Sequence, residues 1–256
     1  MPDSALTHLL CAAERAKVTY ANAEAISFYR SALEQFERVT PATRDVRFDA
    51  LITIYENLGS ILVLTGQRDQ ARLMFQRGLD MLEAREPITQ ARLNRLMANA
   101  WMLNRHREES ERYLQAAQAA LGDDVREDQT TWWHEFIEIG LERLWFMYWF
   151  FAEENLMREL VLSLEPSVNR YGTPTQRSKY YRSRALYELS RCHWYQPDER
   201  VVQLANQAVA AAKQGATPVE LCFAMFGCAF VRLWRDELDM ALAQFLETLL
   251  LAERCG

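Results

Sequence analysis

Histidine and cysteine are the side chains whose spacing decides whether this chain of 256 residues holds a metal. His134 and Glu135 begin like the zinc-binding helix of metalloproteases, but Glu138 stands where that motif needs its second histidine. Cys222 and Cys228 are six residues apart, which places them on roughly opposite faces of a helix. The other histidines and cysteines are scattered, so we predict no metal site and no cofactor.

The chain also lacks the short motifs of nucleotide-binding and hydrolytic sites. It contains no GxxxxGK[ST] phosphate loop, no GxGxxG turn and no GxSxG nucleophile elbow. Adjacent acids such as Glu108 and Glu109 fall at expected helix starts, where carboxylates stabilise the helix dipole. We therefore predict no catalytic residues and no enzyme activity.

A cluster of cations and tyrosines is the candidate for anion binding. Residues 170–191 include six cationic side chains and one acidic side chain, and tyrosines are interleaved with them. Arg177, Arg184 and Arg191 are seven residues apart, so they form a stripe along one edge of a helix. The stripe could hold phosphates, but ion pairs with neighbouring acidic helices explain it better in a chain of net charge −6. We do not expect a nucleic-acid partner.

Residues 144–152 form a run of nine apolar or aromatic side chains, Leu-Trp-Phe-Met-Tyr-Trp-Phe-Phe-Ala. The run is too short to span a bilayer. A helix that is apolar on every face is normally buried all round, which would make this run part of the core. Because a two-layer array of helices cannot bury every face of one helix, the alternative is a surface for a partner or for self-association.

Composition favours long helices in a cytoplasmic protein. Nine glycines and seven prolines are few for this length, so turns are few and many-stranded β architectures are disfavoured. Five cysteines without CxxC spacing argue for a reducing compartment. The acidic balance gives no attraction to anionic membranes.

An internal repeat organises the chain. Three segments place a small residue, a bulky residue four positions later and a small residue three after that: Ala25, Tyr29 and Ala32; Ala71, Phe75 and Gly78; Ser110, Leu114 and Ala117. On a helix these positions share one face, where small side chains let a second helix approach closely. Looser copies follow at Leu156, Leu160 and Ser163; Val201, Ala205 and Ala208; Ala241, Phe245 and Thr248.

The second copy carries a family resemblance. Eight residues resemble the tetratricopeptide repeat in register: Tyr55, Leu58, Gly59, Leu62, Gly66, Ala71, Phe75 and Gly78. The resemblance implies stacked helix pairs that wind into a right-handed superhelix. We predict an all-α fold, an α-solenoid of about six helix pairs in one domain over residues 1–256. The expected pairs cover residues 4–40, 46–86, 88–122, 129–170, 174–214 and 218–256. We expect six prolines to fall between helices: Pro41, Pro87, Pro166, Pro174, Pro197 and Pro218.

The resemblance also implies which residues line a binding groove, because in this family the first helix of each pair faces it. In the fourth pair the candidate partner-binding residues are Leu141, Trp145, Tyr148 and Trp149. In the third pair Arg92, Arg95 and Asn99 stand at groove positions. Arg95 and Asn99 resemble part of the clamp by which some family members hold a peptide's C-terminal carboxylate. The second pair lacks the basic and amide partners, so this clamp is incomplete.

The two ends of the chain suggest a segment of a longer protein. The expected last helix, residues 240–253, is rich in leucine, whereas a solenoid usually ends in a polar cap. Residues 13–26 are similar to repeat regions that follow the ATPase module in large bacterial signalling proteins, including adenylate-cyclase-linked chains. This similarity implies either an excised segment or a last helix that a partner covers.

Together these patterns predict a non-catalytic module that binds a protein or peptide segment in a helical groove. Two alternatives stay open. One is a domain that senses a small molecule or nucleotide within a bacterial signalling protein. The other is a scaffold that self-associates through the aromatic run or the apolar last helix.

Overall fold

The computed structural model describes residues 2–37, 48–82, 86–122, 129–150, 154–191 and 196–254. These residues form twelve α-helices and no strand. The predicted fold class, an all-α solenoid of helix pairs, is confirmed for them. The chain divides into two compact units, Met1–Gly122 and Asp123–Cys255, and each is described by itself. That all the pairs form one continuous domain stays a prediction.

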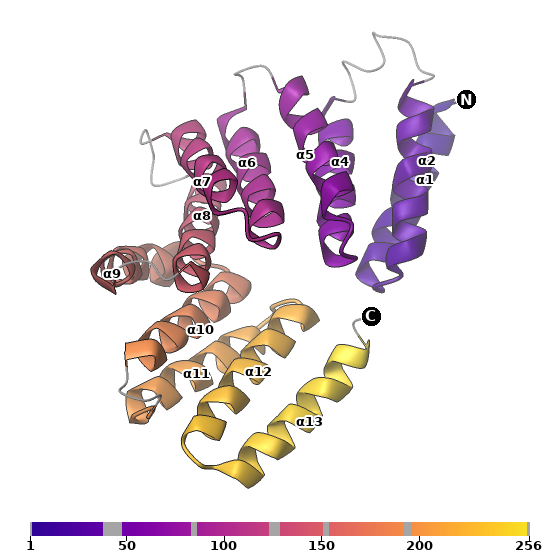
Figure 1. The fold of residues 1–256 in the computed structure, drawn as a ribbon. Coiled ribbons are helices and arrows are strands. Elements are labelled where there is room, and N and C mark those ends of the chain that lie inside the picture. The colour runs from indigo at the N-terminus through magenta and orange to yellow at the C-terminus, as the bar shows by residue number, and fades with distance from the viewer. Residues whose placement is uncertain are drawn as a thin grey trace. The chain divides into compact units, whose positions relative to one another are not determined.

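The first unit contains three helix pairs. Its helices are α1 (Pro2–Val18), α2 (Asn22–Glu37), α4 (Phe48–Leu64), α5 (Arg68–Met81), α6 (Pro87–Met102) and α7 (Arg107–Leu121). Each helix packs on its pair partner, and each pair packs on the next, α2 on α4 and α5 on α6 (Figure 1). Gly66 forms the turn between α4 and α5 with a φ of 77°, a left-handed conformation that glycine adopts without strain.

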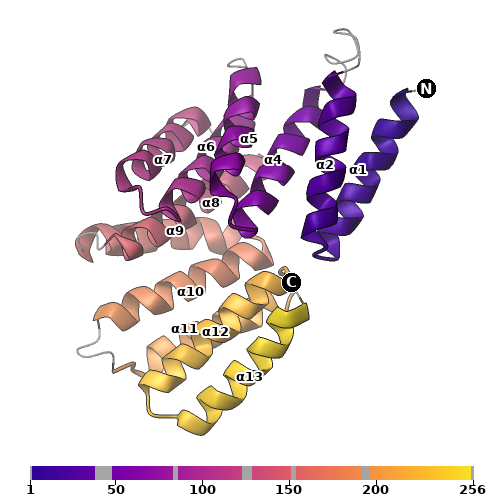
Figure 2. The same cartoon turned by 45° about the vertical axis from the view of Figure 1, so that its right-hand side comes forward.

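The second unit also contains three pairs. Its helices are α8 (Thr130–Trp149), α9 (Glu154–Tyr171), α10 (Pro174–Arg191), α11 (Glu199–Ala212), α12 (Pro218–Trp234) and α13 (Leu238–Arg254). The helix α10 packs on α8, α9, α11 and α12, so it stands at the centre of this unit. Figure 2 shows α10 to α13 side by side in chain order. The six observed pairs begin and end close to the six ranges expected from the sequence.

The repeated small–bulky–small positions explain how the helices pair. In the second helix of five pairs the two small residues of the triplet are buried, and so are the bulky Tyr29, Phe75 and Leu114. Small side chains at these places bring the two backbones together, and the bulky one fills the space between them.

The fourth pair departs from the expected register by one residue. In α9 the buried residues are Met157, Val161 and Leu164, while Leu156 and Ser163 are exposed. Neighbouring positions on a helix point about 100° apart, so this shift turns a different face toward the core. The expected register was wrong because Leu156 and Leu160 are as apolar as Met157 and Val161, and the small but exposed Ser163 completed the pattern on the wrong face.

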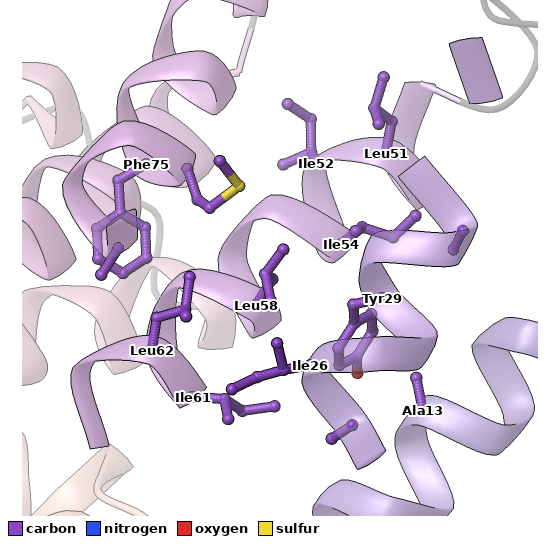
Figure 3. Packing of buried hydrophobic residues seen from close by; sticks show 14 of the residues in the cluster. Ala13, Ile26, Tyr29, Leu51, Ile52, Ile54, Leu58, Ile61, Leu62 and Phe75 are labelled. Atoms are coloured by element: carbon purple, nitrogen blue, oxygen red, sulfur yellow. The ribbon is translucent and has the colours of Figure 1, made fainter. Parts of the chain in front are cut away.

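Close packing within a pair is tightest at two glycines. Figure 3 shows Tyr29 beside Ala13 and Ile54, and Phe75 beside Leu62, in the core of the first unit. A Cβ atom on Gly59 of α4 would lie 2.3 Å from Cε1 of Phe75. In the second unit a Cβ on Gly140 of α8 would lie 2.4 Å from Cδ2 of Leu164. A methyl group at either position would therefore force the facing side chain to shift within a close-packed core.

Most prolines stand where they were expected. Pro87 and Pro218 occupy the first turn of their helices, where no backbone N–H is needed, and Pro174 begins α10. Pro166 contradicts the expectation, because it lies inside α9. The buried side chains of Leu164 and Val168 hold the helix on both sides of it and offset the missing hydrogen bond. Pro41 lies outside the described residues.

Two glycine substitutions in the second unit test this packing. We expect Gly140→Ala to lower the free energy of unfolding by about 1–3 kcal/mol, because the new methyl group collides with Leu164. Gly227→Ala on α12 is the matched control, since its Cβ would meet Cγ of Arg182 at an ordinary 3.5 Å. The control should be neutral or stabilising by up to about 1 kcal/mol, because alanine favours the helix. Urea unfolding followed by circular dichroism measures both, and equal effects would contradict the account.

Candidate functional site

The helix α8 is enclosed by its neighbours over most of its length. Ile137, Leu141 and Leu144 belong to a core that side chains of α9 and α10 complete. Leu141 is only 4% exposed. The prediction that Leu141 contacts a partner is therefore wrong, because its side chain packs inside the second unit.

The last turns of α8 carry an aromatic cluster. Trp145 lies near-parallel to Tyr148, with ring centroids 6.1 Å apart, and edge-on to Trp149 at 5.5 Å. Tyr148 and Trp149 also meet edge-on at 5.6 Å. Trp149 is 48% exposed, whereas Trp145 and Tyr148 are half-buried. The structure thus brings these three predicted residues together and leaves Trp149 open to solvent.

Arg182 of α10 links this cluster to α12. Its guanidinium carbon lies 5.5 Å from the ring centroid of Trp145 and 5.4 Å from that of Phe223. The cation is therefore within cation–π distance of aromatic rings from two different helices. Phe223 is 52% exposed. We call Trp145, Tyr148, Trp149, Arg182 and Phe223 the aromatic surface.

A buried acid fixes the position of Arg182. Nε of Arg182 lies 3.4 Å from Oε1 of Glu220, and the hydroxyl of Ser178 donates to the same oxygen at 3.0 Å. Both Glu220 and Ser178 are buried. A buried carboxylate requires a charged or hydrogen-bonding partner, so Glu220 restrains the guanidinium between the two rings.

The local sequence explains why Glu220 stands there. Thr217 is the N-cap of α12, and its side-chain oxygen accepts a hydrogen bond from the backbone N–H of Glu220 at 3.2 Å. Pro218 follows at the first helical position. The pattern Thr-Pro-Val-Glu therefore starts the helix and places the carboxylate near its positive end, which stabilises the charge.

Sequence reasoning missed Arg182 and Phe223 as members of the surface. Arg182 was counted only among the cations of its helix, because the rings beside it come from α8 and α12. The residue spacing that selected the groove residues of the fourth pair would also have selected Phe223 in the sixth pair.

A second contact between α10 and α8 joins Lys179 to Glu138, with Nζ and Oε2 3.0 Å apart.

The predicted groove residues of the first unit are engaged within that unit. Nη1 of Arg92 lies 3.2 Å from Oε1 of Glu56 on α4. Arg95 is only 9% exposed and Asn99 is half-buried. The structure therefore contradicts the prediction that Arg95 presents its charge to a peptide carboxylate, because the side chain is buried between helices.

Arg184, from the predicted stripe of α10, is paired inside the second unit. Its Nη1 contacts the carboxylate of Glu165 on α9. The neighbouring Tyr180 is buried and donates a hydrogen bond to the carbonyl oxygen of Val161 at 3.0 Å. Burial raises the pKa of Tyr180 to about 12, so the hydroxyl keeps its proton and remains a donor at neutral pH.

The two outer arginines of the stripe differ from each other. Arg191 pairs with Glu154 at 2.7 Å and with Glu188 at 3.5 Å. The hydrogen bond that Arg191 donates to the Glu154 carboxylate raises the pKa of Arg191. Arg177 instead donates to the backbone carbonyl oxygen of Asn169 at 3.4 Å. Arg184 and Arg191 thus each have a carboxylate partner within the unit, whereas Arg177 donates to a backbone carbonyl, so the three arginines do not act as one stripe.

The apolar last helix has the exposed face that the sequence indicated. Only Ala241 and Thr248 of α13 are buried. Five leucines are each more than half exposed: Leu238, Leu242, Leu246, Leu249 and Leu250. Within the described residues no helix is long and apolar enough to cross a membrane, and no three His, Cys, Asp or Glu side chains gather as a metal site.

Comparison with known proteins supports the fold and leaves the function open. No family model and no curated protein matches the chain. The chain is similar to the crystal structure of BtubC (BKLC) from P. vanneervenii, with a TM-score of 0.62 over 91% of this chain and 91% of that chain. The two sequences are 12% identical, so the likeness concerns the helical fold alone.

A double-mutant cycle tests the contact that holds Arg182. We expect Arg182→Met to lower the free energy of unfolding by about 2 kcal/mol, since it leaves the buried Glu220 without its charged partner. Adding Glu220→Gln should restore at least half of that loss, because the uncompensated charge is then gone. Lys213→Met, at an exposed position after α11, is the control and should change stability by less than about 0.5 kcal/mol. Additive losses in the double variant would contradict the pairing.

Proposed function

We propose that this protein is a non-catalytic interaction module of the tetratricopeptide-repeat kind that binds a segment of a protein partner on its aromatic surface. Its side chains there offer aromatic faces and one restrained guanidinium, which are groups that bind rather than groups that react. The partner segment contributes apolar side chains that cover Trp149 and Phe223.

One observation carries this proposal. Trp149 of α8 and Phe223 of α12 are about half exposed. Phe223 lies within cation–π distance of Arg182, and Trp149 meets Trp145, the other ring beside that guanidinium. Folded proteins rarely leave large aromatic side chains exposed together unless they serve contact with a partner. Tryptophan and arginine are also the residue types that contribute most binding energy in protein interfaces.

The surroundings of the surface favour a preformed site. Glu220 and Ser178 fix Arg182, and the neighbouring rings hold Trp145. A site that is already ordered loses less conformational entropy when a partner binds. We also propose a cytoplasmic location in a bacterial signalling protein, in line with Cys11 and Cys228, which form no disulfide with another described residue.

Peptide selection tests the proposal without a known partner. Random peptides displayed on phage are selected against the whole chain, and the affinities of selected peptides are then measured for variants. We expect Trp149→Ala and Phe223→Ala each to weaken binding by about tenfold or more, because each removes an exposed anchor. Leu156→Ala, which removes an equally exposed side chain from α9, should leave affinity unchanged. Peptides that bind all variants equally, or failure to select any peptide, would reject the aromatic surface as the site.

The leucine face of α13 favours a second candidate function, self-association with another copy of the chain. Asp239 and Arg254 lie near the two ends of α13, at nearly equal distances from its central residue, Leu246. In an antiparallel pairing of two α13 helices, Asp239 of one copy therefore comes level with Arg254 of the other. Exposed leucines in the centre and opposite charges at the ends suit such a pairing.

Light scattering on a sizing column over a tenfold range of concentration distinguishes this second candidate. We expect the wild-type chain to approach the mass of two copies as concentration rises. Leu246→Glu combined with Leu249→Glu should return it to the mass of one copy, because buried charges oppose the pairing. Leu156→Glu on α9 is the control and should behave as wild type. A wild-type mass of one copy throughout would remove self-association from consideration.

A further inference from the structure

A cavity of about 190 Å³ lies in the second unit where α9, α10 and α11 meet. Its charged lining consists of Arg158 from α9, Arg184, Glu188 and Arg191 from α10, and Arg200 from α11. Four guanidinium groups thus line the cavity together with one carboxylate. We call it the arginine cavity; none of its residues belongs to the aromatic surface.

The acids around the cavity leave positive charge in excess. Glu188 pairs with Arg191 at 3.5 Å and with Arg200 at 3.4 Å. Glu154 and Glu165 stand outside the lining, and each pairs with one of the four arginines. The arginines of the cavity therefore carry four positive charges, and their carboxylate partners carry three negative charges. Because each guanidinium carries five N–H donors, one carboxylate partner still leaves donors for a ligand.

Two buried donors point to the chemistry of that ligand. Tyr187 lines the cavity and is 2% exposed, and its hydroxyl has no hydrogen-bond partner among the described residues. Nε of Arg184, three residues earlier on the same helix, is also buried and without an acceptor in the described part of the chain. Buried polar atoms in folded proteins nearly always have a partner. Both residues line the cavity, so their unpartnered donors suit a ligand rich in acceptor oxygens.

Arg158 adds an exposed charge at the same place. It makes no ion pair with another described residue, although it lines the cavity opposite the residues of α10. Arg158, Arg184 and Arg200 come from three different helices, so their guanidinium groups approach the cavity from different sides. A ligand group whose acceptor oxygens point in several directions suits this arrangement better than a carboxylate, whose oxygens lie in one plane.

We propose that the arginine cavity binds the phosphate group of a small phosphate monoester. Such a group carries close to two negative charges and three terminal oxygens that accept hydrogen bonds from arginine and tyrosine. The volume suits a small ligand, since a cavity of about 150 Å³ holds a benzene molecule. The apolar Val161 and Leu162 complete the lining and provide a contact for the organic part of the ester. This inference does not depend on the aromatic surface.

Calorimetric titration at constant ionic strength tests the proposal, with inorganic phosphate, phenyl phosphate and sulfate as the probes. We expect phenyl phosphate to bind saturably and more tightly than inorganic phosphate, because its ring reaches the apolar part of the lining. Sulfate should bind at least about tenfold more weakly than phenyl phosphate, because it lacks that ring. Phenyl phosphate should also raise the melting temperature of the whole chain.

Variants separate a role in binding from a role in folding. Tyr187→Phe should weaken phenyl phosphate binding by about three- to tenfold while leaving the melting temperature without ligand unchanged or higher, because a buried hydroxyl without a partner is removed. Arg158→Gln should weaken it by about tenfold or more. Arg254→Gln removes one exposed charge from α13 and should leave affinity unchanged.

Three results would overturn the proposal. One is the absence of saturable binding by either phosphate probe. A second is an equal loss of affinity in Arg254→Gln and Arg158→Gln, which would show attraction to net charge alone. The third is a Tyr187→Phe variant that loses stability but keeps its affinity, which would assign the tyrosine to folding.

Discussion

Close approach of the two helices within each pair is the constraint on which the rest of this structure depends. Small residues such as Ala71 and Ala205 let the backbones come together, and Gly59 and Gly140 mark where even a methyl group would force the facing side chain to shift. Because these positions fix how each helix is rotated, they also decide which of its residues face away from its pair partner. Binding surfaces in this protein are therefore a consequence of how the pairs pack.

The second unit shows that consequence most clearly. Its first helices, α8, α10 and α12, contact one another in succession and bring Trp145, Arg182 and Phe223 together, with Trp149 beside Trp145. The opposite side of α10 meets α9 and α11 and carries the arginine cavity. One central helix thus contributes a restrained cation to an aromatic surface and several cations to a separate polar cavity. Glu220 keeps the first of these charges in place.

Local patterns predicted more of the fold than of the site. The small–bulky–small offsets identified the buried face in five of six pairs, since a 3.6-residue period is a property of each helix alone. They failed in α9, where Leu156 and Met157 are both apolar and only packing selects Met157. Trp145 and Trp149 were found from their own helix. Arg182 and Phe223 were not, because their significance arises only where three helices meet.

The central claim is that the aromatic surface is open in the free chain and is covered by a partner. Hydroxyl-radical footprinting read by mass spectrometry measures this directly, because oxidation of a side chain follows its exposure to solvent. The account predicts rapid oxidation of Trp149 and Phe223, slow oxidation of the buried Leu141, and protection of both aromatic residues when a selected peptide is added. Slow oxidation of Trp149 and Phe223 in the dilute free chain would contradict it.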